Sequence, residues 1–315
     1  MVNNRNELVV LGSTSSTNYP TTAGALQSSF RGGSPLNPYR SGEAVYQLTN
    51  GSDLVITRLN ATGSALAAST YLGGSGNDGV VGQPNSIAAN YGDAFRSDVL
   101  LDGDGNVFIA AASGSTDFPG VTQGFNSAYR GGAADGVVCK VAANLGAVLW
   151  AGYIGGSGAD AAYAVQRDSQ GRVYVCGGTA SANFPVTSGA YRTTQPGGST
   201  DGFAARISPD GRTLERATFI GTAAYDQAYF LQARRLGQPV FVWANPGPVP
   251  HHPGFVRPDR RHPVYSETKP RPDRQPLQHH LWQPQRRERR PQPGAHRLPR
   301  GRMRTGVHQR LGWLH

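Results

Sequence analysis

The chain has 315 residues and a formal net charge of +10, a balance that suggests a partner such as nucleic acid or an anionic surface. The charge is divided unevenly, since residues 1–232 carry 13 basic and 16 acidic residues and residues 233–315 carry 17 and 4. All 8 histidines lie in the second part, which excludes a Ser-His-Asp triad and a histidine metal site from residues 1–232. The sequence predicts no membrane span, and its first residues do not resemble a signal peptide.

A repeat organises the chain from Asp102 to Gln232, and each of its landmarks returns at an offset of 66. It begins at a turn, continues through an aromatic-proline pair and an Asp-Gly pair, and ends at a glycine-rich turn that is followed by an aspartate. The matching positions are Asp102 and Asp168, Phe118-Pro119 and Phe184-Pro185, Asp135 and Asp201, Gly155 and Gly221, and Asp160 and Asp226.

Each repeat predicts four short strands. In the unit that starts at Gly136 these strands are 137–141, 148–154, 162–165 and 172–176, and each is bounded by Gly, Asp or Ser clusters. The last of them is apolar on both faces, so neighbouring layers must cover it on both sides. Small sheets stacked as the blades of a β-propeller meet this requirement, whereas the coils of the rival β-solenoid are shorter than this repeat. We therefore expect an all-β fold, a partial β-propeller of about three four-stranded blades over residues 1–232.

The first unit is a copy of the same repeat with two insertions. Tyr19-Pro20 matches Phe118-Pro119 at an offset of 99, while Asp53 and Asp78 match Asp135 and Asp160 at an offset of 82. The differences place insertions near residues 35–50 and 82–96. Insertions in repeat folds form loops, which either bind ligands or are tolerated at the surface. The segment Asn3–Glu7 occupies the turn position of Asp102–Asn106, so the chain is expected to begin inside a hairpin.

Several recurring residues predict structural roles. The aromatic rings of Phe118 and Phe184 are expected to pack between blades, with Pro119 and Pro185 ending strand pairing. The recurring aspartates favour hydrogen bonds to turn amides over acid-base pairs. The residues assigned to this repeat framework are Phe118, Pro119, Phe184, Pro185, Gly155, Gly156, Asp160 and Asp226.

A calcium loop is an alternative interpretation of Asp102, Asp104 and Asn106, because alternate oxygen ligands suit Ca²⁺. The equivalent turn at Asp168 retains one carboxylate, and this favours a simple Asp/Gly β-turn. Cys139 and Cys176 lie in apolar strands and are expected to be buried free thiols, without metal-binding spacing.

The composition of residues 233–315 is dominated by Arg, Pro, His and Gln, which predicts a disordered tail. The genetic code offers a sharper explanation. A shift of one nucleotide across 233–243 permits Leu-Asp-Asp-Ser-Gly-Asn-Leu-Tyr-Leu-Phe-Gly, which matches Asp168–Gly177 at the same offset of 66. The sequence therefore predicts a frameshift just after Gln232, with a natural disordered linker and a nucleic-acid-binding tail as alternatives.

These motifs resemble the bacterial seven-bladed β-propeller repeat (SBBP) family over about residues 3–232. The family combines a Tyr-Leu-Gly-Gly-Ser-Gly-x-Asp turn with a Thr-x-Phe-Pro motif, and here these stand at Tyr71–Asp78, Tyr153–Asp160 and Thr116–Pro119. The shifted frame also resembles large secreted surface proteins of gliding bacteria, which carry gliding-motility or type IX secretion sorting domains. The resemblance implies an extracellular or cell-surface location for the parent protein, and it supplies no catalytic residue and no cofactor.

The favoured hypothesis is a non-enzymatic structural or binding module, a fragment of a secreted or cell-surface repeat protein involved in adhesion. Its partner would be a surface glycan or a protein. The alternative is a carbohydrate-active propeller enzyme, which requires unlike carboxylates gathered from different blades. A third hypothesis, nucleic-acid binding through the basic tail, requires salt-dependent binding that disappears when residues 233–315 are deleted.

Overall fold

The computed structural model describes residues 1–38, 47–83, 85–88, 92–233 and 239–244. These residues form strands and loops together with three single turns of 3-10 helix, and the part described contains no α-helix. No helix within these ranges is long and apolar enough to cross a membrane. The protein is all-β, as the sequence predicts. The 3-10 turns are η1 (Ser86–Ala88), η2 (Asp93–Phe95) and η3 (Val121–Gln123).

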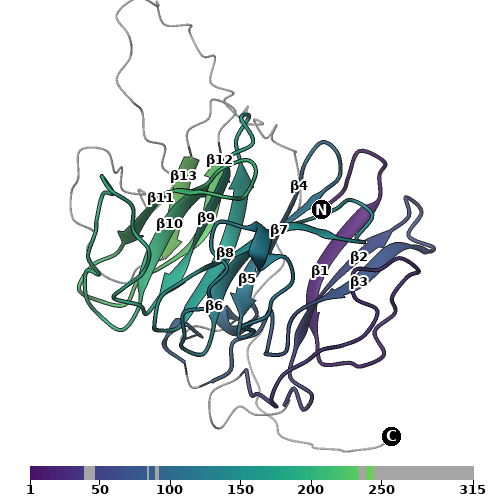
Figure 1. Cartoon of the computed structure of the whole chain (residues 1–315), viewed down its shortest axis with the longest axis horizontal. Coiled ribbons are helices and arrows are strands. Elements are labelled where there is room, and N and C mark those ends of the chain that lie inside the picture. Colours follow the sequence, from purple (N-terminus) through teal and green to yellow (C-terminus); the bar gives the residue numbers. More distant parts are fainter. Residues whose placement is uncertain (39–46, 84, 89–91, 234–238, 245–315) are drawn as a thin grey trace, which may run out of the picture. The chain divides into compact units, whose positions relative to one another are not determined.

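The strands form a series of antiparallel meanders that follow one another in chain order (Figure 1). Together they make a partial β-propeller, with two four-stranded blades between a three-stranded blade and a hairpin. Blade 1 consists of β1 (Leu8–Thr14), β2 (Asp53–Leu59) and β3 (Leu66–Leu72). Blade 2 consists of β4 (Asp98–Leu101), β5 (Val107–Ser113), β6 (Asp135–Val141) and β7 (Val148–Ile154). Blade 3 consists of β8 (Asp160–Arg167), β9 (Val173–Thr179), β10 (Asp201–Ile207) and β11 (Leu214–Ile220), and the hairpin consists of β12 (Gln227–Ala233) and β13 (Pro239–Ala244).

The sequence repeat is reproduced in the strand register. In blade 2 Val107 pairs with Val141, and in blade 3 the equivalent residues of the next repeat, Val173 and Ile207, form the same pair. Each of the three blades has a bulge at the end of the strand that pairs with the outermost strand. Equivalent residues therefore face the same way in every blade, because a one-residue slip would turn each side chain to the opposite face.

Alternate residues of each strand enter two different cores. Val107 and Ile109 of β5 pack with Val9 and Ile56 of blade 1. Phe108 and the other side chains on the opposite face of blade 2 pack against blade 3. Blade 2 is thus covered on both faces, which is why its strands are apolar at successive positions.

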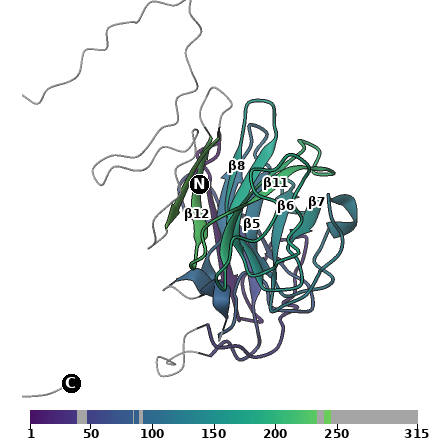
Figure 2. The ribbon, with the colours of Figure 1, turned by 90° about the vertical axis from the view of Figure 1, so that its left-hand side faces the viewer.

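Neighbouring blades contact each other mainly through their two inner strands. Strand β8 packs against β5 of the preceding blade and against β12 of the hairpin, and Figure 2 shows these three strands beside one another. The insertion predicted near 82–96 covers this region. Its residues Ile87 and Ala94 are buried with Ala161, Tyr163 and Tyr229. These described residues of the insertion are therefore part of the hydrophobic core, as expected for a structural insertion.

Regular secondary structure continues beyond Gln232, the residue at which the sequence predicts that the propeller repeats end and a disordered tail begins. Strand β13 pairs with β12 inside the segment for which disorder is expected. Residues 240–243 are β-branched or aromatic, and such residues favour strands next to an unpaired edge. The pairing of Gln232 with Val240 matches that of Gln166 with Tyr174, again at an offset of 66. Residues 234–238 and 245–315, the rest of the predicted tail, lie outside the described part of the chain.

Candidate binding site

The loop that suggested calcium forms a hydrogen-bonded β-turn. One carboxylate oxygen of Asp102, Oδ1, accepts hydrogen bonds from the amides of Asp104 (3.0 Å) and Asn106 (2.9 Å). The other, Oδ2, accepts a bond from Nδ2 of Asn106 and lies 3.0 Å from Nζ of Lys140. Burial acts to raise the pKa of Asp102, but the bonds from Asn106 and Lys140 outweigh it and lower the pKa below its usual value. Asp168 closes the equivalent turn in the same way, so the carboxylate of this loop serves the turn itself.

The glycine-rich turn between β7 and β8 joins blade 2 to blade 3. Asp160, the first residue of β8, accepts hydrogen bonds from the amide of Gly156 (2.8 Å) and from the hydroxyl of Ser181 (2.6 Å). Ser181 in turn accepts a bond from the amide of Gly158, which lies in the same turn. The predicted bonds between the aspartate and turn amides are present, and the hydroxyl ties the connecting turn to the end of β9 in blade 3.

A second carboxylate lies beside Asp160 at this junction. Asp135, the first residue of β6, is fully buried, and its Oδ2 accepts a hydrogen bond from the amide of Arg130. A Cβ atom built on Gly155 would be 2.7 Å from Oδ2 of Asp160 and inside van der Waals contact of Oδ1 of Asp135. Burial raises the pKa of Asp135 to about 7, and the charge of Asp160 contributes to this rise. Burial also raises the pKa of Asp160, to about 6.

The same pair recurs at every blade junction in the described structure. Sequence reasoning treated the aspartates as separate turn residues and missed that they meet. The signal was their constant offset of 25, which places one carboxylate at the start of β2, β6 or β10 and the other after the next glycine-rich turn. The pairs are Asp53 with Asp78, Asp135 with Asp160, and Asp201 with Asp226, and they converge on Gly73, Gly155 and Gly221.

The close approach to Gly155 yields a stability prediction. We expect Gly155→Ala to destabilise the protein by about 1–3 kcal/mol, because the new methyl group forces two buried carboxylates apart. Urea unfolding followed by tryptophan fluorescence measures the change. Gly103→Ala is the matched control, since a Cβ atom there meets nothing within 4 Å. Equal effects of the two substitutions would contradict this account of the junction.

The aromatic-proline pairs place rings between blades, as predicted. Phe118 is buried in the core shared by blades 1 and 2, and Phe184 is buried in the core shared by blades 2 and 3. The ring of Phe184 lies 4.7 Å from that of Phe203 and 5.6 Å from that of Phe219. Pro119 and Pro185 follow these rings outside the strands. The Phe-Pro pairs are therefore structural residues of the junctions.

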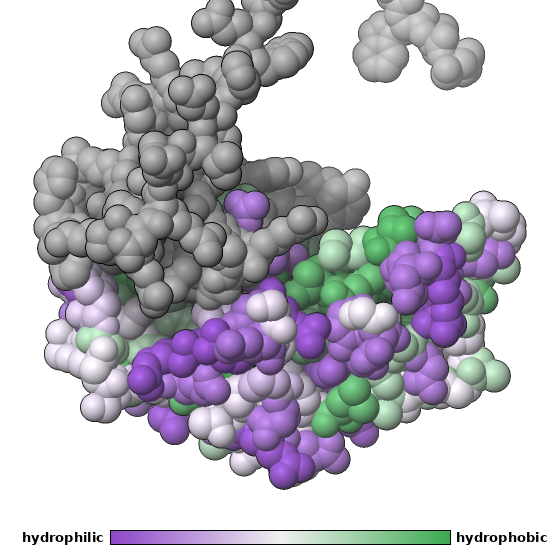
Figure 3. Space-filling model, turned by 90° about the horizontal axis from the view of Figure 1, so that it is seen from above, coloured by the Kyte–Doolittle hydropathy of each residue, from purple (hydrophilic) through white to green (hydrophobic). Residues whose placement is uncertain are grey.

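In blade 1 a tyrosine-proline pair takes the place of the Phe-Pro pair, and it lies on a partly exposed face. Tyr19 stands in place of Phe118 and is only half-buried, and its hydroxyl lies 2.6 Å from that of Thr57. Leu8 and Val10 on β1 are exposed, whereas the equivalent residues of β5 are buried. Figure 3 shows hydrophobic patches between hydrophilic residues on one face of the molecule. The hydroxyl of Thr57 thus gives this half-buried tyrosine a hydrogen-bond partner.

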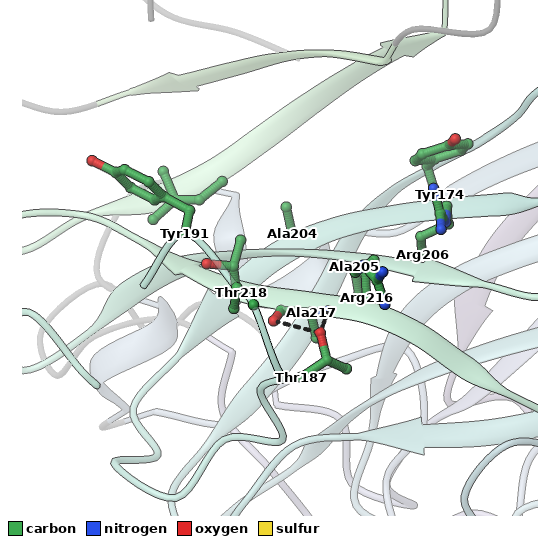
Figure 4. A pocket seen from close by; sticks show the side chains of 12 residues that line it. Tyr174, Thr187, Tyr191, Ala204, Ala205, Arg206, Arg216, Ala217 and Thr218 are labelled. Carbon is green, nitrogen blue, oxygen red and sulfur yellow. Dashed lines mark hydrogen bonds between the residues drawn. The ribbon is translucent and has the colours of Figure 1, made fainter. Parts of the chain in front are cut away.

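A hollow of about 300 Å³ opens on the face of blade 3 that points away from blade 2. Ala204 and Thr218 line it on β10 and β11, and the ring of Tyr191 stands at one end (Figure 4). Tyr174 and Arg206 lie at the opposite end of the same hollow. Sequence reasoning did not single out these residues. The sequence did offer one signal, because these residues differ in type from the residues at the equivalent repeat positions of blade 2.

The matching region of blade 2 is covered by blade 3, since Phe108, Val138 and Trp150 belong to the core that the two blades share. The ring of Phe125 packs directly on Gly152, where a Cβ atom would lie 2.5 Å from it, and Trp150 is buried against Phe108. In blade 3 a threonine replaces the glycine, an arginine replaces the tryptophan, and Tyr191, which replaces Phe125, is exposed. The blade 2 residues Phe108, Phe125, Val138, Lys140, Trp150 and Gly152 correspond to Tyr174, Tyr191, Ala204, Arg206, Arg216 and Thr218 of blade 3.

Comparisons with known proteins supply no family. No protein-family model matches the chain. No curated protein sequence matches it either.

The hollow offers groups that can bind a ligand. The residues that line it in the described structure include two tyrosines, two threonines and two arginines but no carboxylate. The carboxylate pairs lie instead inside the blade junctions, where they are buried. The arrangement therefore provides hydrogen-bond donors and an aromatic ring around an apolar floor, a composition typical of ligand sites.

Proposed function

We propose that this chain is a non-enzymatic binding module of a secreted or cell-surface repeat protein, and that the hollow on blade 3 is its ligand site. The observation that carries the proposal is the contrast between equivalent positions. The face of blade 2 that carries Phe125 and Trp150 packs against blade 3, whereas the equivalent face of blade 3 carries Tyr191, Arg216 and Thr218 around an open volume of about 300 Å³. The polar residues at positions that are apolar in the packed blade support a role in binding.

A binding screen with a matched variant tests the proposal. The full chain would be titrated with soluble polysaccharides and peptides by isothermal titration calorimetry, and the same mixtures would be examined for breakdown products. We expect saturable binding of at least one ligand without turnover. The double substitution Arg216→Trp and Thr218→Gly restores the residues of blade 2, fills the hollow and is expected to abolish binding.

The carboxylates provide the test of the enzyme alternative. Turnover of a glycan that was lost in Asp53→Asn or Asp135→Asn would overturn the non-enzymatic proposal. Arg5→Gln serves as the control for a change of charge, because Arg5 lies in an exposed turn remote in sequence from the hollow. Binding that survived in the double variant would move the ligand site to another surface.

The proposed location rests on the resemblance of the repeat motifs to the SBBP family and to surface proteins of gliding bacteria. Antibody labelling of intact source cells tests it, and labelling that required permeabilised cells would refute it. We also propose that the reading frame changes after Gln232. Sequencing the source DNA across this codon tests the frame, and an uninterrupted frame would leave the basic tail as an encoded extension.

A further inference from the structure

The rim of the hollow is cationic. Arg206 and Arg216 lie on neighbouring strands, β10 and β11, and both line the hollow. Arg192, next to Tyr191 in the chain, has its guanidinium 5.9 Å from the ring centre of that tyrosine. The nearby carboxylate of Glu215 lies 2.8 Å from Nε of Arg206 and neutralises one of these charges. An excess of positive charge therefore faces a ligand, and guanidinium groups bind carboxylates through paired hydrogen bonds.

The ligand is not expected to be an added β-strand. Extended peptides commonly bind by pairing with the free edge of a sheet. The edge of β11 is already occupied, since Thr187 bonds to both the amide and the carbonyl of Ala217. The carbonyl of Arg192 accepts a bond from the amide of Phe219 in the same way. This blocked edge favours a compact ligand that enters the hollow from above the sheet.

The exposed ring of Tyr191 completes the site. It is 44 % exposed and stands at one end of the hollow, above a floor of small side chains (Figure 4). A flat apolar ring of this kind packs against the apolar face of a sugar, while its hydroxyl and the arginines bond to polar substituents. Thr218 and Thr187 are held by hydrogen bonds that tie β11 to the segment that carries Tyr191, so the wall of the hollow is pre-organised.

We propose that the hollow binds a sugar residue that carries a carboxylate, as in a uronic-acid glycan. Arg206 and Arg216 bind the carboxylate, and Tyr191 packs against the ring. This inference rests on the proposed binding function and names its ligand class. The carboxylate accounts for the arginines that replace Lys140 and Trp150, and the sugar ring accounts for the tyrosine that replaces Phe125.

The test compares a galacturonate hexamer with its fully methyl-esterified form, which has the same sugar rings without the charges. Calorimetry on the full chain is expected to show that the acid binds roughly tenfold more tightly than the ester, the difference made by one charge-assisted hydrogen bond. The double substitution Arg206→Gln and Arg216→Gln should remove this preference while binding of the ester persists. Arg5→Gln should leave both affinities unchanged, and raised salt should weaken binding of the acid alone.

Two outcomes overturn this inference and leave the proposed function standing. One is equal binding of acid and ester that disappears when Arg216→Trp and Thr218→Gly fill the hollow. The other is tighter binding of hexaglutamate than of the galacturonate hexamer, which would assign the hollow to acidic peptides. Failure of both hexamers to bind the unmodified protein also overturns it. In that case the wider ligand screen decides the proposed function separately. The unfolding midpoint of each variant shows whether a lost signal reflects loss of the fold.

Discussion

We expect Phe184→Ala to lower the free energy of unfolding by about 3–5 kcal/mol, the range seen when a buried phenylalanine is truncated. Phe184 is 3 % exposed and packs against Phe203 and Phe219 in the core between blades 2 and 3. Its removal leaves a cavity that these strands cannot close, because backbone pairing fixes them on both sides. Urea unfolding monitored by far-ultraviolet circular dichroism measures the effect.

Two controls separate the cavity from other causes. Phe184→Leu keeps most of the volume and is expected to cost less than about 1.5 kcal/mol. Leu149→Ala removes an apolar side chain that is already exposed on β7, and it should change stability by less than about 0.5 kcal/mol. A small effect of Phe184→Ala would mean that the Phe-Pro pair does not hold the two blades together.

Stability is expected to fall as the pH rises from 5 to 8, in contrast to proteins that are denatured by acid. Burial raises the pKa of Asp78 to about 7, of Asp135 to about 7, of Asp160 to about 6 and of Asp201 to about 7. An unfolded aspartate has a pKa of about 3.9. Between these values the folded protein holds more protons than the unfolded chain, so protonation favours folding. This stabilisation is complete below about pH 4 and is lost as the pH rises through about 6 to 7.

The expected size is large because the carboxylates recur at every junction. A pKa rise from 3.8 to about 6 at Asp160 corresponds to about 3 kcal/mol, and the two carboxyls of one junction titrate as a coupled pair. Urea unfolding at pH 5 and pH 8 measures the difference. Asp160→Asn keeps the shape of the side chain without its charge, so it should stabilise the protein at pH 8 and reduce the pH dependence.

The exposed Asp104 supplies the control for this substitution. Asp104→Asn changes a turn residue outside the junctions and should leave the pH dependence as it is in the unmodified protein. Greater stability at pH 8 than at pH 5 would contradict the inferred effect of buried charge. Ser181→Ala is a further check, because loss of the hydroxyl bond to Asp160 should steepen the fall.

The repeat itself could be read from the sequence because its causes are local. The alternation of apolar residues fixes which face each side chain takes, and Asp-Gly turns fix where each hairpin reverses. Asp102 and Asp168 close their turns through bonds to residues two and four positions later, so nearby residues alone determine them. The offset of 66 therefore predicts the strand register, and the apolar residues on both strand faces predict the stacked blades.

The functional features depend on contacts between distant residues, and these required the tertiary structure. Asp135 and Asp160 start separate strands in neighbouring blades, and only the stacking of those blades brings their carboxylates together at Gly155. The hollow likewise depends on which parts of the fold pack over Thr218 and Arg216. No local sequence pattern determines that packing. Pairing with β12 also determined strand β13, where composition alone predicted disorder. Sequence periodicity thus determined the architecture, whereas burial and packing across blades decided the charge pairs and the candidate site.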